Sequence, residues 1–208
     1  FLPLKLSGQL QPGVFGVPGH ISSQYLSGLL FALPLLSRPS GISLTTPLES
    51  APYVAMTIRT LARFGVRVEP VQNGFYVPAP QVYQPTVYTI EKDYSQAAFW
   101  LVAAYGGCKV TVTGLPEETA QGDKAIVELL SLFSKRQSET VIDASQIPDL
   151  VPILSVAAVL TSTRTRIIRA GRLRLKESDR LKATCDALYR IGADIKETSD
   201  GLLIHGAG

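Results

Sequence analysis

The chain has 208 residues, of which 46% are apolar and 18% are charged, and its net charge is +3. This apolar fraction supports a buried core and excludes a disordered chain, while so small a charge on this length excludes a nucleic-acid-binding protein. The longest apolar stretch, Tyr25–Leu36, contains Pro34 and is too short to cross a bilayer. We expect one large or two small domains, without a membrane segment, in the cytoplasm.

Cysteine and histidine are scarce, with two of each. Cys108 and Cys185 lie in apolar contexts and show no C-x-x-C spacing, so a disulfide framework or a zinc site is not expected. We predict that both are small buried hydrophobic residues. The chain also has no G-x-G-x-x-G motif, and we expect it to need neither a metal nor another cofactor.

The first predicted elements are two helices with a strand between them. A serine cap and an apolar run predict a helix over Ser22–Leu36, and a strand follows over Gly41–Thr45. Val54, Ile58 and Leu61 recur at helical spacing and predict the second, amphipathic helix.

A predicted hairpin completes this first unit. Gly65 stands where a left-handed residue would end the second helix, and Val66–Val68 then alternates as a strand. Asn73-Gly74 is a typical hairpin turn leading into a second short strand. Prolines interrupt the pattern soon afterwards, so we place a domain boundary within Val82–Thr89, between domains 1–85 and 86–208.

The second domain repeats the same alternation of elements. The predicted helices are Ser95–Tyr105, Ala125–Phe133, Asp149–Leu160 and an amphipathic helix carrying Leu181, Cys185 and Leu188. The predicted strands are Cys108–Thr113, Thr165–Arg169 and one carrying Ala193 and Ile195, followed by an Asp200-Gly201 turn. The apolar helices each begin at a Ser or Asp, which we read as an N-cap.

An internal repeat organises these elements. Arg63–Val77 and Arg190–Ile204 share the pattern R-[FI]-G-[VA]-x-[VI], four residues, then [ND]-G-[FL]-x-[VI], at an offset of 127 residues. We therefore predict an α/β fold of three βαβαββ units, each of about 63 residues. The middle unit is defective, because Ser134–Thr140 stands where its hairpin should be. Either that hairpin has been lost or residues are missing there, and we favour the second because a lost hairpin would leave a sheet edge uncovered.

The most charged stretch of the chain, Arg172–Lys182, precedes the last helix. One interpretation is a solvated helix start with Asp179 near the N-cap. However, the equivalent segment Leu48–Tyr53 is almost uncharged, and a structural turn would not need Lys176, Glu177 and Arg180 together. These three residues offer an ammonium and a guanidinium for anions, and a carboxylate that can move protons.

At this motif the chain resembles a known family. LRLKESDRLKA at Leu173–Ala183, SSQYLSGLL at Ser22–Leu30, IPDLVP at Ile147–Pro152 and TAQGDKA at Thr119–Ala125 resemble the 5-enolpyruvylshikimate-3-phosphate synthases, also called 3-phosphoshikimate 1-carboxyvinyltransferases. The resemblance covers essentially the whole chain. The related enolpyruvyl transferases that act on UDP-N-acetylglucosamine share the repeat fold but lack the KESDR motif, so they are the less favoured alternative.

The resemblance implies a fold and a reaction. The family fold has two domains of three βαβαββ units each, so the chain would be a central part of a monomeric protein about twice as long. The implied enzyme transfers the enolpyruvyl group of phosphoenolpyruvate to the 5-hydroxyl of shikimate 3-phosphate, in the shikimate pathway to chorismate and aromatic amino acids. Because parts of the family's site are not found among these residues, we expect the 208-residue chain to be inactive. A non-catalytic module that binds shikimate 3-phosphate stays open as an alternative.

The resemblance also assigns site residues. It implies that Asp149 is a general base at the attacking hydroxyl, although a plain N-cap was favoured from the residues alone. It implies that Glu177 shuttles protons at the phosphoenolpyruvate methylene group, and that Arg180 and Gln24 contact phosphoenolpyruvate. The contacts implied for shikimate 3-phosphate are Ser22, Ser23, Gln24, Ser50, Tyr53, Asp149 and Lys176. Arg172 stands where some members carry an Asn, and it receives no role.

The repeat adds one expectation of its own. Ser50 and Glu177 are 127 residues apart, and so are Tyr53 and Arg180. We therefore expect equivalent loops of two repeat units to carry the site, one on each domain and facing a shared cleft that domain approach would close.

Overall fold

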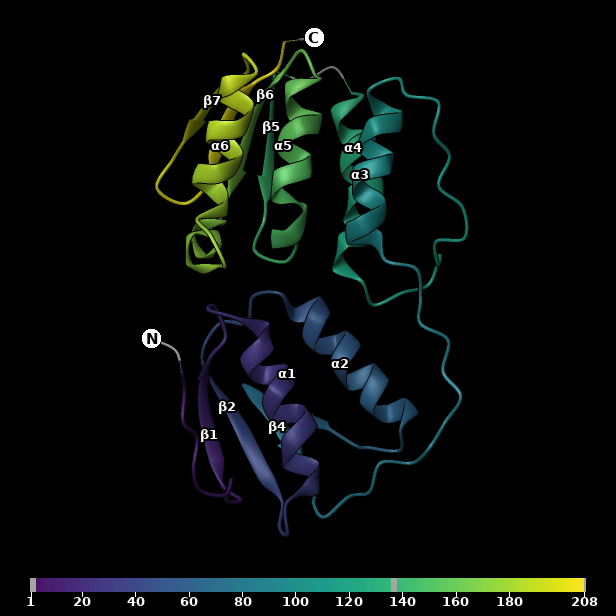
Figure 1. Ribbon diagram of the computed structural model, residues 1–208, viewed down its shortest axis with the longest axis vertical. Helices are drawn as coiled ribbons and strands as arrows, with labels where there is room; N and C mark the ends of the chain where they lie inside the picture. The colour runs from purple at the N-terminus through teal and green to yellow at the C-terminus, as the bar shows by residue number, and fades with distance from the viewer. Residues whose placement is uncertain (1–2, 136–137, 208) are drawn as a thin grey trace. The chain divides into compact units, whose positions relative to one another are not determined.

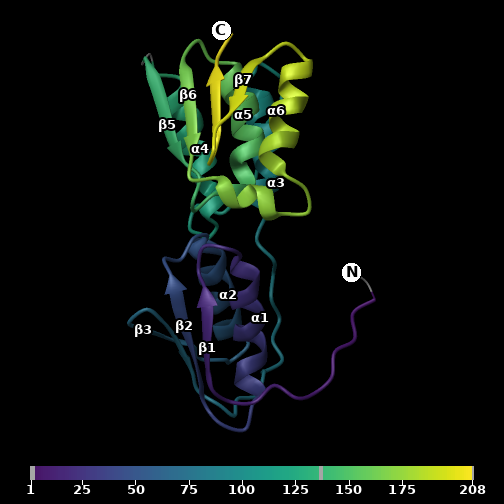
Figure 2. The ribbon, with the colours of Figure 1, turned by 90° about the vertical axis from the view of Figure 1, so that its left-hand side faces the viewer.

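The computed structural model describes residues 3–135 and 138–207 of the chain, which form an α/β protein (Figures 1 and 2). It divides into two compact units. The first contains the chain up to Leu48 together with Val54–Tyr88, and the second contains Glu49–Tyr53 and the chain from Thr89 onward. The sequence placed the boundary between residues 85 and 86 and left Glu49–Tyr53 in the first domain, so the two divisions differ mainly in that short segment.

The first unit is built on a four-stranded sheet. Its strands are β1 Val14–Pro18, β2 Ser40–Thr46, β3 Glu69–Val71 and β4 Gly74–Val77, in the order β1-β2-β4-β3. Its helices are α1 Ser23–Ala32, a short 3-10 helix Leu33–Leu35 and the larger part of α2 Ala51–Arg63. β1 and β2 are parallel, and the other pairs are antiparallel. The core lies between the sheet and both helices, and it includes Leu26, Leu30, Val54 and Leu61.

The second unit repeats this sheet. Its strands are β5 Glu139–Asp143, β6 Arg164–Ile168, β7 Asp194–Glu197 and β8 Leu202–His205, in the order β5-β6-β8-β7. Its α-helices are α3 Tyr94–Tyr105, α4 Ala125–Phe133, α5 Val151–Val159 and α6 Arg180–Arg190. Its 3-10 helices are Gly122–Lys124, Pro148–Leu150 and Gly171–Leu175. Strand directions match those of the first sheet, which confirms the predicted repeat.

Both hairpins follow from the predicted turns. Asn73 adopts a left-handed φ of 59° between β3 and β4. A Cβ on Gly74 would overlap the carbonyl oxygen of Ile42 on the neighbouring strand. A Cβ on Gly201 would overlap the carbonyl oxygen of Ile167 in the same way. Each turn therefore needs glycine because another backbone passes too close for a side chain. The helix-ending glycines Gly65 and Gly192 also have the predicted positive φ.

The middle unit departs from the prediction. Cys108–Thr113 was predicted to be a strand, but its described backbone is not assigned to one. A strand needs a hydrogen-bonding neighbour, and the hairpin predicted to supply one falls between the end of α4 at Phe133 and the start of β5 at Glu139. Residues 136 and 137 of the questioned segment lie outside the described part of the chain. Cys108 is exposed, so the prediction that it is buried was wrong, whereas Cys185 is half-buried against the core.

One predicted helix start is confirmed, and two smaller differences concern the start of a helix and of a strand. Ser22 caps α1 as predicted, accepting a hydrogen bond from the Gln24 backbone N–H at 3.3 Å. Asp93, rather than Ser95, caps α3. β3 begins at Glu69, so Val66–Val68 precedes the strand that it was predicted to form. No helix within residues 3–135 and 138–207 is long and apolar enough to cross a membrane.

Candidate active site in the second unit

The segment Glu49–Tyr53 is held in the second unit by its own hydrogen bonds. The backbone N–H of Ser50 donates to the carbonyl oxygen of Ser145 at 3.0 Å, and the N–H of Ala51 donates to Oε1 of Gln146 at 2.9 Å. Both acceptors lie in the loop after β5. The expectation that Ser50 and Tyr53 belong to the other domain from Glu177 and Arg180 was therefore wrong: all four lie in one compact unit.

Arg172 fixes this segment from the opposite side. Its side chain is 5% exposed, and its guanidinium donates to Oγ of Ser50 at 2.8 Å and to the carbonyl oxygen of Ser145 at 2.7 Å. The carboxylate of Glu49 lies 3.2 Å from its Nε. Burial lowers the pKa of this guanidinium, and the Glu49 charge opposes that effect. Arg172 received no role from the sequence, because Ser50 lies 122 residues away along the chain.

The hydroxyl of Tyr53 lies between two carboxylates. It is 2.6 Å from Oδ2 of Asp123 and 3.0 Å from Oδ2 of Asp149. Burial and the two neighbouring negative charges raise the pKa of Tyr53 above its ordinary value, so the phenol keeps its proton. Tyr53 is therefore a hydrogen-bond donor here rather than only a packed aromatic ring.

Asp149 connects this tyrosine to the charged motif before α6. Nη1 of Arg180 donates to Oδ1 of Asp149 at 2.8 Å, and Nη2 donates to Oε2 of Glu177 at 2.8 Å. A hydrogen bond from its own backbone N–H and the neighbouring Arg180 lower the pKa of the exposed Glu177 carboxyl. The three predicted residues Asp149, Glu177 and Arg180 are thus brought into one contiguous network.

The local chain explains why Asp149 is available for this network. Pro148–Leu150 is a turn of 3-10 helix with proline at its start, and α5 begins only at Val151 with no side-chain cap. The side chain of Asp149 therefore does not cap the helix, contrary to the reading favoured from the residues alone, and points to Tyr53 and Arg180 instead.

Part of the charged motif is structural. Asp179 caps α6 by accepting from the Lys182 backbone N–H at 2.9 Å. Arg174 donates to Asp179 at 2.9 Å and to Glu197 at 2.6 Å, which ties the motif to β7. Lys176, which lies between Arg174 and Glu177 in the sequence, is half-buried. The interpretation of a helix start with Asp179 at the N-cap is therefore confirmed, while the anion-binding role of Lys176, Glu177 and Arg180 stays a prediction.

The remaining predicted residues, Ser22, Ser23 and Gln24, open α1 in the first unit. Ser22 and Ser23 are half-buried and Gln24 is exposed. His20 lies just before them, and its ring Nδ1 is 2.7 Å from Oγ1 of Thr46. The N-terminus of α1 therefore carries two serine hydroxyls on that unit, at the positive end of the helix dipole, which is suited to an anion.

Asp123 is a member of this network that the sequence did not single out. It lies in the short helix Gly122–Lys124, is 4% exposed and accepts the hydrogen bond of Tyr53. Burial raises its pKa to about 6, and Asp149 and Asp93 add to the effect, while the hydrogen bond from Tyr53 lowers it. Its motif TAQGDKA carried part of the resemblance, but an acidic residue just before a helix is ordinary in sequence.

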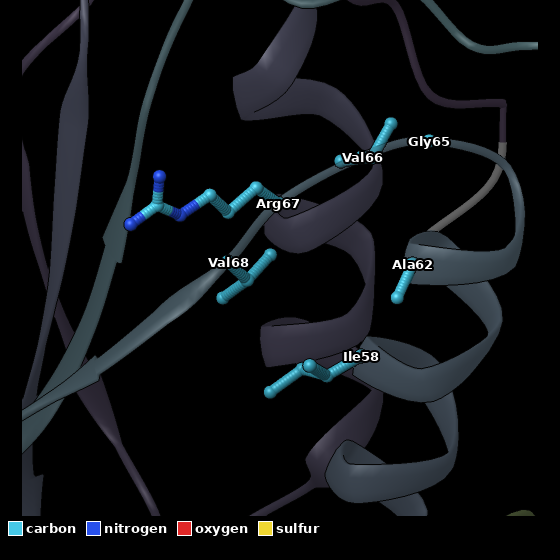
Figure 3. A pocket seen from close by; sticks show the side chains of 6 residues that line it. All are labelled: Ile58, Ala62, Gly65, Val66, Arg67 and Val68. Atoms are coloured by element: carbon cyan, nitrogen blue, oxygen red, sulfur yellow. The ribbon is translucent and has the colours of Figure 1, made fainter.

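A separate pocket of about 300 Å³ lies in the first unit (Figure 3). It is lined by Ile58, Ala62, Gly65, Val66, Arg67 and Val68. The guanidinium of Arg67 extends away from α2, and it pairs with Glu69 at 3.1 Å. This pocket offers no pair of acid and base groups. Within the described ranges, no three His, Cys, Asp or Glu side chains are grouped so that they could hold a metal ion.

Solved structures share the architecture of this chain. An EPSP synthase from Acinetobacter baumannii matches with a TM-score of 0.72 at 23% identity, covering 96% of this chain and 50% of that one. The enolpyruvyl transferase NikO from Streptomyces tendae matches with a TM-score of 0.58 at 14% identity, covering 95% and 52%. The fold is therefore that of the enolpyruvyl transferases.

Sequence comparisons define the family more closely. The sequence profile of EPSP synthase (3-phosphoshikimate 1-carboxyvinyltransferase) matches residues 1–208, and the chain belongs to this family. A protein from Clostridium acetobutylicum named 3-phosphoshikimate 1-carboxyvinyltransferase is 47% identical over 99% of this chain and 51% of its own length. A protein of the same name from Clostridium perfringens is 43% identical over 99% and 52%. The chain thus spans about half the length of these curated relatives.

The alignment with the Clostridium acetobutylicum protein runs over 218 positions, 10 more than the 208 residues of the chain. That relative therefore carries residues within the matched region that this chain does not.

Proposed function

We propose that the protein to which this chain belongs transfers the enolpyruvyl group of phosphoenolpyruvate to the 5-hydroxyl of shikimate 3-phosphate and releases phosphate. Family membership and the names of the relatives support this reaction. The observation that carries it to particular residues is the network in which Arg180 bridges Asp149 and Glu177. Because the chain spans about half of its relatives, we propose the activity for the whole protein and expect none from the 208 residues by themselves.

The reaction divides into addition and elimination. In the addition, the substrate hydroxyl oxygen bonds to C2 of phosphoenolpyruvate, the hydroxyl loses its proton, and the methylene carbon gains one. In the elimination, the new methyl group loses a proton, the double bond re-forms, and the C2–O bond to phosphate breaks. Asp149 would accept the hydroxyl proton, and Glu177 would give and later remove the proton at carbon. Arg180 would hold the phosphoenolpyruvate anion through its planar guanidinium.

The contact between Arg180 and Glu177 suggests how Glu177 could serve as an acid. Paired with Arg180, its carboxyl has a lowered pKa and is ionised at neutral pH, so it has no proton to give. A substrate anion that takes over the guanidinium would remove that partner, and the pKa of Glu177 would rise. Substrate binding would thus convert Glu177 into a group able to hold a proton.

The contacts to shikimate 3-phosphate remain a proposal for each residue. Ser50 and Tyr53 would bind shikimate 3-phosphate beside Asp149. Lys176, the residue before Glu177, would supply a positive charge to the same substrate. In the first unit, Ser22, Ser23 and Gln24 at the start of α1 would bind the 3-phosphate, with Gln24 also contacting phosphoenolpyruvate.

Phosphate release tests the reaction. The longest natural protein that contains these residues should release phosphate from shikimate 3-phosphate plus phosphoenolpyruvate, whereas the 208-residue chain should not. Shikimate without its phosphate and UDP-N-acetylglucosamine serve as control acceptors. Release with UDP-N-acetylglucosamine alone would move the assignment to the related transferases. Release by the 208-residue chain would contradict the expectation that it is inactive.

The cellular setting follows from the same proposal. Two free cysteines suit a reducing compartment, and we infer that the protein works in the cytoplasm as a monomer. Sedimentation of the whole protein at micromolar concentration should give the mass of one chain, and a dimer would contradict this.

A further inference from the structure

Asp123 has an unusual environment for a carboxylate. It is 4% exposed, and only its Oδ2 has a hydrogen-bond partner, the hydroxyl of Tyr53 at 2.6 Å. Its Oδ1 is buried and has no hydrogen-bond partner among the residues that the structure describes. Burying a carboxylate oxygen without a hydrogen bond costs free energy of folding. We therefore expect a role of Asp123 beyond packing.

The geometry around Tyr53 indicates that purpose. A phenol has one proton, and the Tyr53 oxygen lies 2.6 Å from Asp123 and 3.0 Å from Asp149. The proton can point at only one of these oxygens at a time, and the shorter distance favours Asp123. The oxygen of Tyr53 then turns a lone pair toward Oδ2 of Asp149, which is an acceptor facing an acceptor.

In that arrangement Oδ2 of Asp149 receives no hydrogen bond from Tyr53. A carboxylate that receives a hydrogen bond is stabilised in its charged form and is a weaker base. A proton that reaches Oδ2 of Asp149 can instead be donated to the lone pair of the Tyr53 oxygen, 3.0 Å away. Arg180 already donates to the other oxygen, Oδ1, at 2.8 Å, so Oδ2 is the oxygen on which Tyr53 acts.

We propose that Asp123 is a positioning residue that accepts the hydrogen bond of the Tyr53 hydroxyl and thereby leaves Asp149 free to accept the proton of the attacking substrate hydroxyl. After that transfer, the protonated Asp149 donates to the Tyr53 oxygen, and Tyr53 still donates to Asp123. No atom other than the substrate proton changes its covalent partner. The inference rests on the proposed role of Asp149 as the base.

The arrangement depends on the charge of Asp123. The ionisable groups that face it are Tyr53 of α2, Asp149 of Pro148–Leu150 and Asp93, the N-cap of α3. On its own short helix, the Lys124 ammonium donates to the carbonyl oxygen of Glu117. Once Asp123 gains a proton, it no longer attracts the phenol proton strongly, and that proton turns to Asp149. Because the pKa of Asp123 is raised to about 6, this change would occur near that pH.

The first test observes the tyrosine directly in the 208-residue chain. With 13C at Cζ of tyrosine, the Tyr53 signal, assigned with Tyr53→Phe, should shift with a midpoint near pH 6. The response should be lost in Asp123→Asn. The matched control is Asp93→Asn, which removes a nearby charge but keeps a good N-cap and should retain the response. A response that persists in Asp123→Asn, or a signal that does not shift near pH 6, would overturn the proposal.

The second test uses turnover by the whole protein. Asp123→Asn should lower kcat at pH 7.5 by about 10-fold, leave KM for shikimate 3-phosphate nearly unchanged, and remove the acidic limb near pH 6. A raised KM with unchanged kcat and unchanged pH profile would show that Asp123 only supports the fold. If no variant or wild type transfers enolpyruvyl at all, the proposed function fails, while the tyrosine signal still decides whether Asp123 positions Tyr53.

Discussion

The guanidinium of Arg172 donates to the hydroxyl oxygen of Ser50 across 122 residues of sequence. This bond, the Glu49 ion pair and the backbone bond from Ser50 to Ser145 hold Glu49–Tyr53 in the second unit. Ser50 has a left-handed φ of 55°, which costs a non-glycine residue free energy and persists only where surrounding contacts fix it. Arg172 therefore determines the position of a predicted substrate contact without being one itself.

Removing this guanidinium should destabilise the second unit. In Arg172→Met, Glu49 loses its buried partner, and we expect the free energy of unfolding to fall by about 3–5 kcal/mol. Urea unfolding followed by the fluorescence of Trp100, the single tryptophan, reports on this unit because Trp100 lies in α3. Arg164→Met is the matched control, since its ion pair with Glu139 is exposed and should contribute less than about 1 kcal/mol. Equal losses in the two variants would show that Arg172 is not the anchor.

Removing the Glu177 carboxylate should slow the reaction. In the whole protein, we expect Glu177→Gln to lower kcat by about 10²–10⁴-fold, the usual contribution of a general acid–base group. The equivalent acid-to-amide change Asp186→Asn, at an exposed site on α6 where Asp186 pairs with Lys182, should leave kcat unchanged. Unchanged turnover in Glu177→Gln would remove Glu177 from the mechanism.

Removing Arg180 should change the titration of Glu177. Because Arg180 helps to lower the pKa of this carboxyl, Arg180→Met should raise it toward its ordinary value. The 13C shift of the Glu177 carboxyl, followed between pH 2 and pH 7 in the 208-residue chain, measures the change. Lys182→Met, on the same helix, should leave that titration in place, and an identical curve in Arg180→Met would contradict the proposed coupling.

The buried charge of Asp123 should make stability depend on pH. Its folded pKa is raised from an ordinary 3.8 to about 6, so the folded chain binds this proton more tightly than the unfolded chain does. Its contribution to stability is therefore present below pH 4 and is lost as the pH rises through 6, amounting to about 3 kcal/mol at most. Asp123→Asn should match wild type at pH 4 and be more stable at pH 8 in thermal melts. A variant that is less stable than wild type at pH 8 would contradict this account.

The middle unit should gain order from additional residues. We infer that the extra residues of the Clostridium acetobutylicum relative belong between Ser134 and Glu139, where the repeat predicts a hairpin. When this segment is inserted, it should form strands that pair with Cys108–Thr113 and bury Cys108. The strand content measured by circular dichroism should then rise. The reaction rate of Cys108 with a thiol reagent should fall, with Cys185 as internal reference. An unchanged rate would place the extra residues elsewhere.

The sequence predicted the local features that depend on neighbours along the chain. The paired glycines at an offset of 127 residues marked both hairpins, since each turn requires the absence of a side chain. The KESDR residues identified the side of the second unit where Arg180 and Glu177 meet Asp149.

What could not be predicted depends on contacts between distant segments. The partners of Arg172 and Asp123 lie 122 and 70 residues away, and no periodicity marks them. Asp149 was interpreted as a helix cap because the sequence does not distinguish the 3-10 turn Pro148–Leu150 from the start of α5. In the structure Asp149 lies within that turn, and its side chain does not cap a helix. Cys108–Thr113 had the alternation of a strand but not the neighbour that makes one.

The interleaving of Glu49–Tyr53 with the second unit has a consequence for gene recombination. A crossover with a relative near residue 85 appears harmless in an alignment, because it falls between secondary-structure elements. Such a chimera would nevertheless join Glu49, Ser50 and Tyr53 from one parent to Arg172, Asp123 and Asp149 from the other. Chimeras should therefore function only when the parents agree at these six positions, and a crossover before Glu49 should be the safer one.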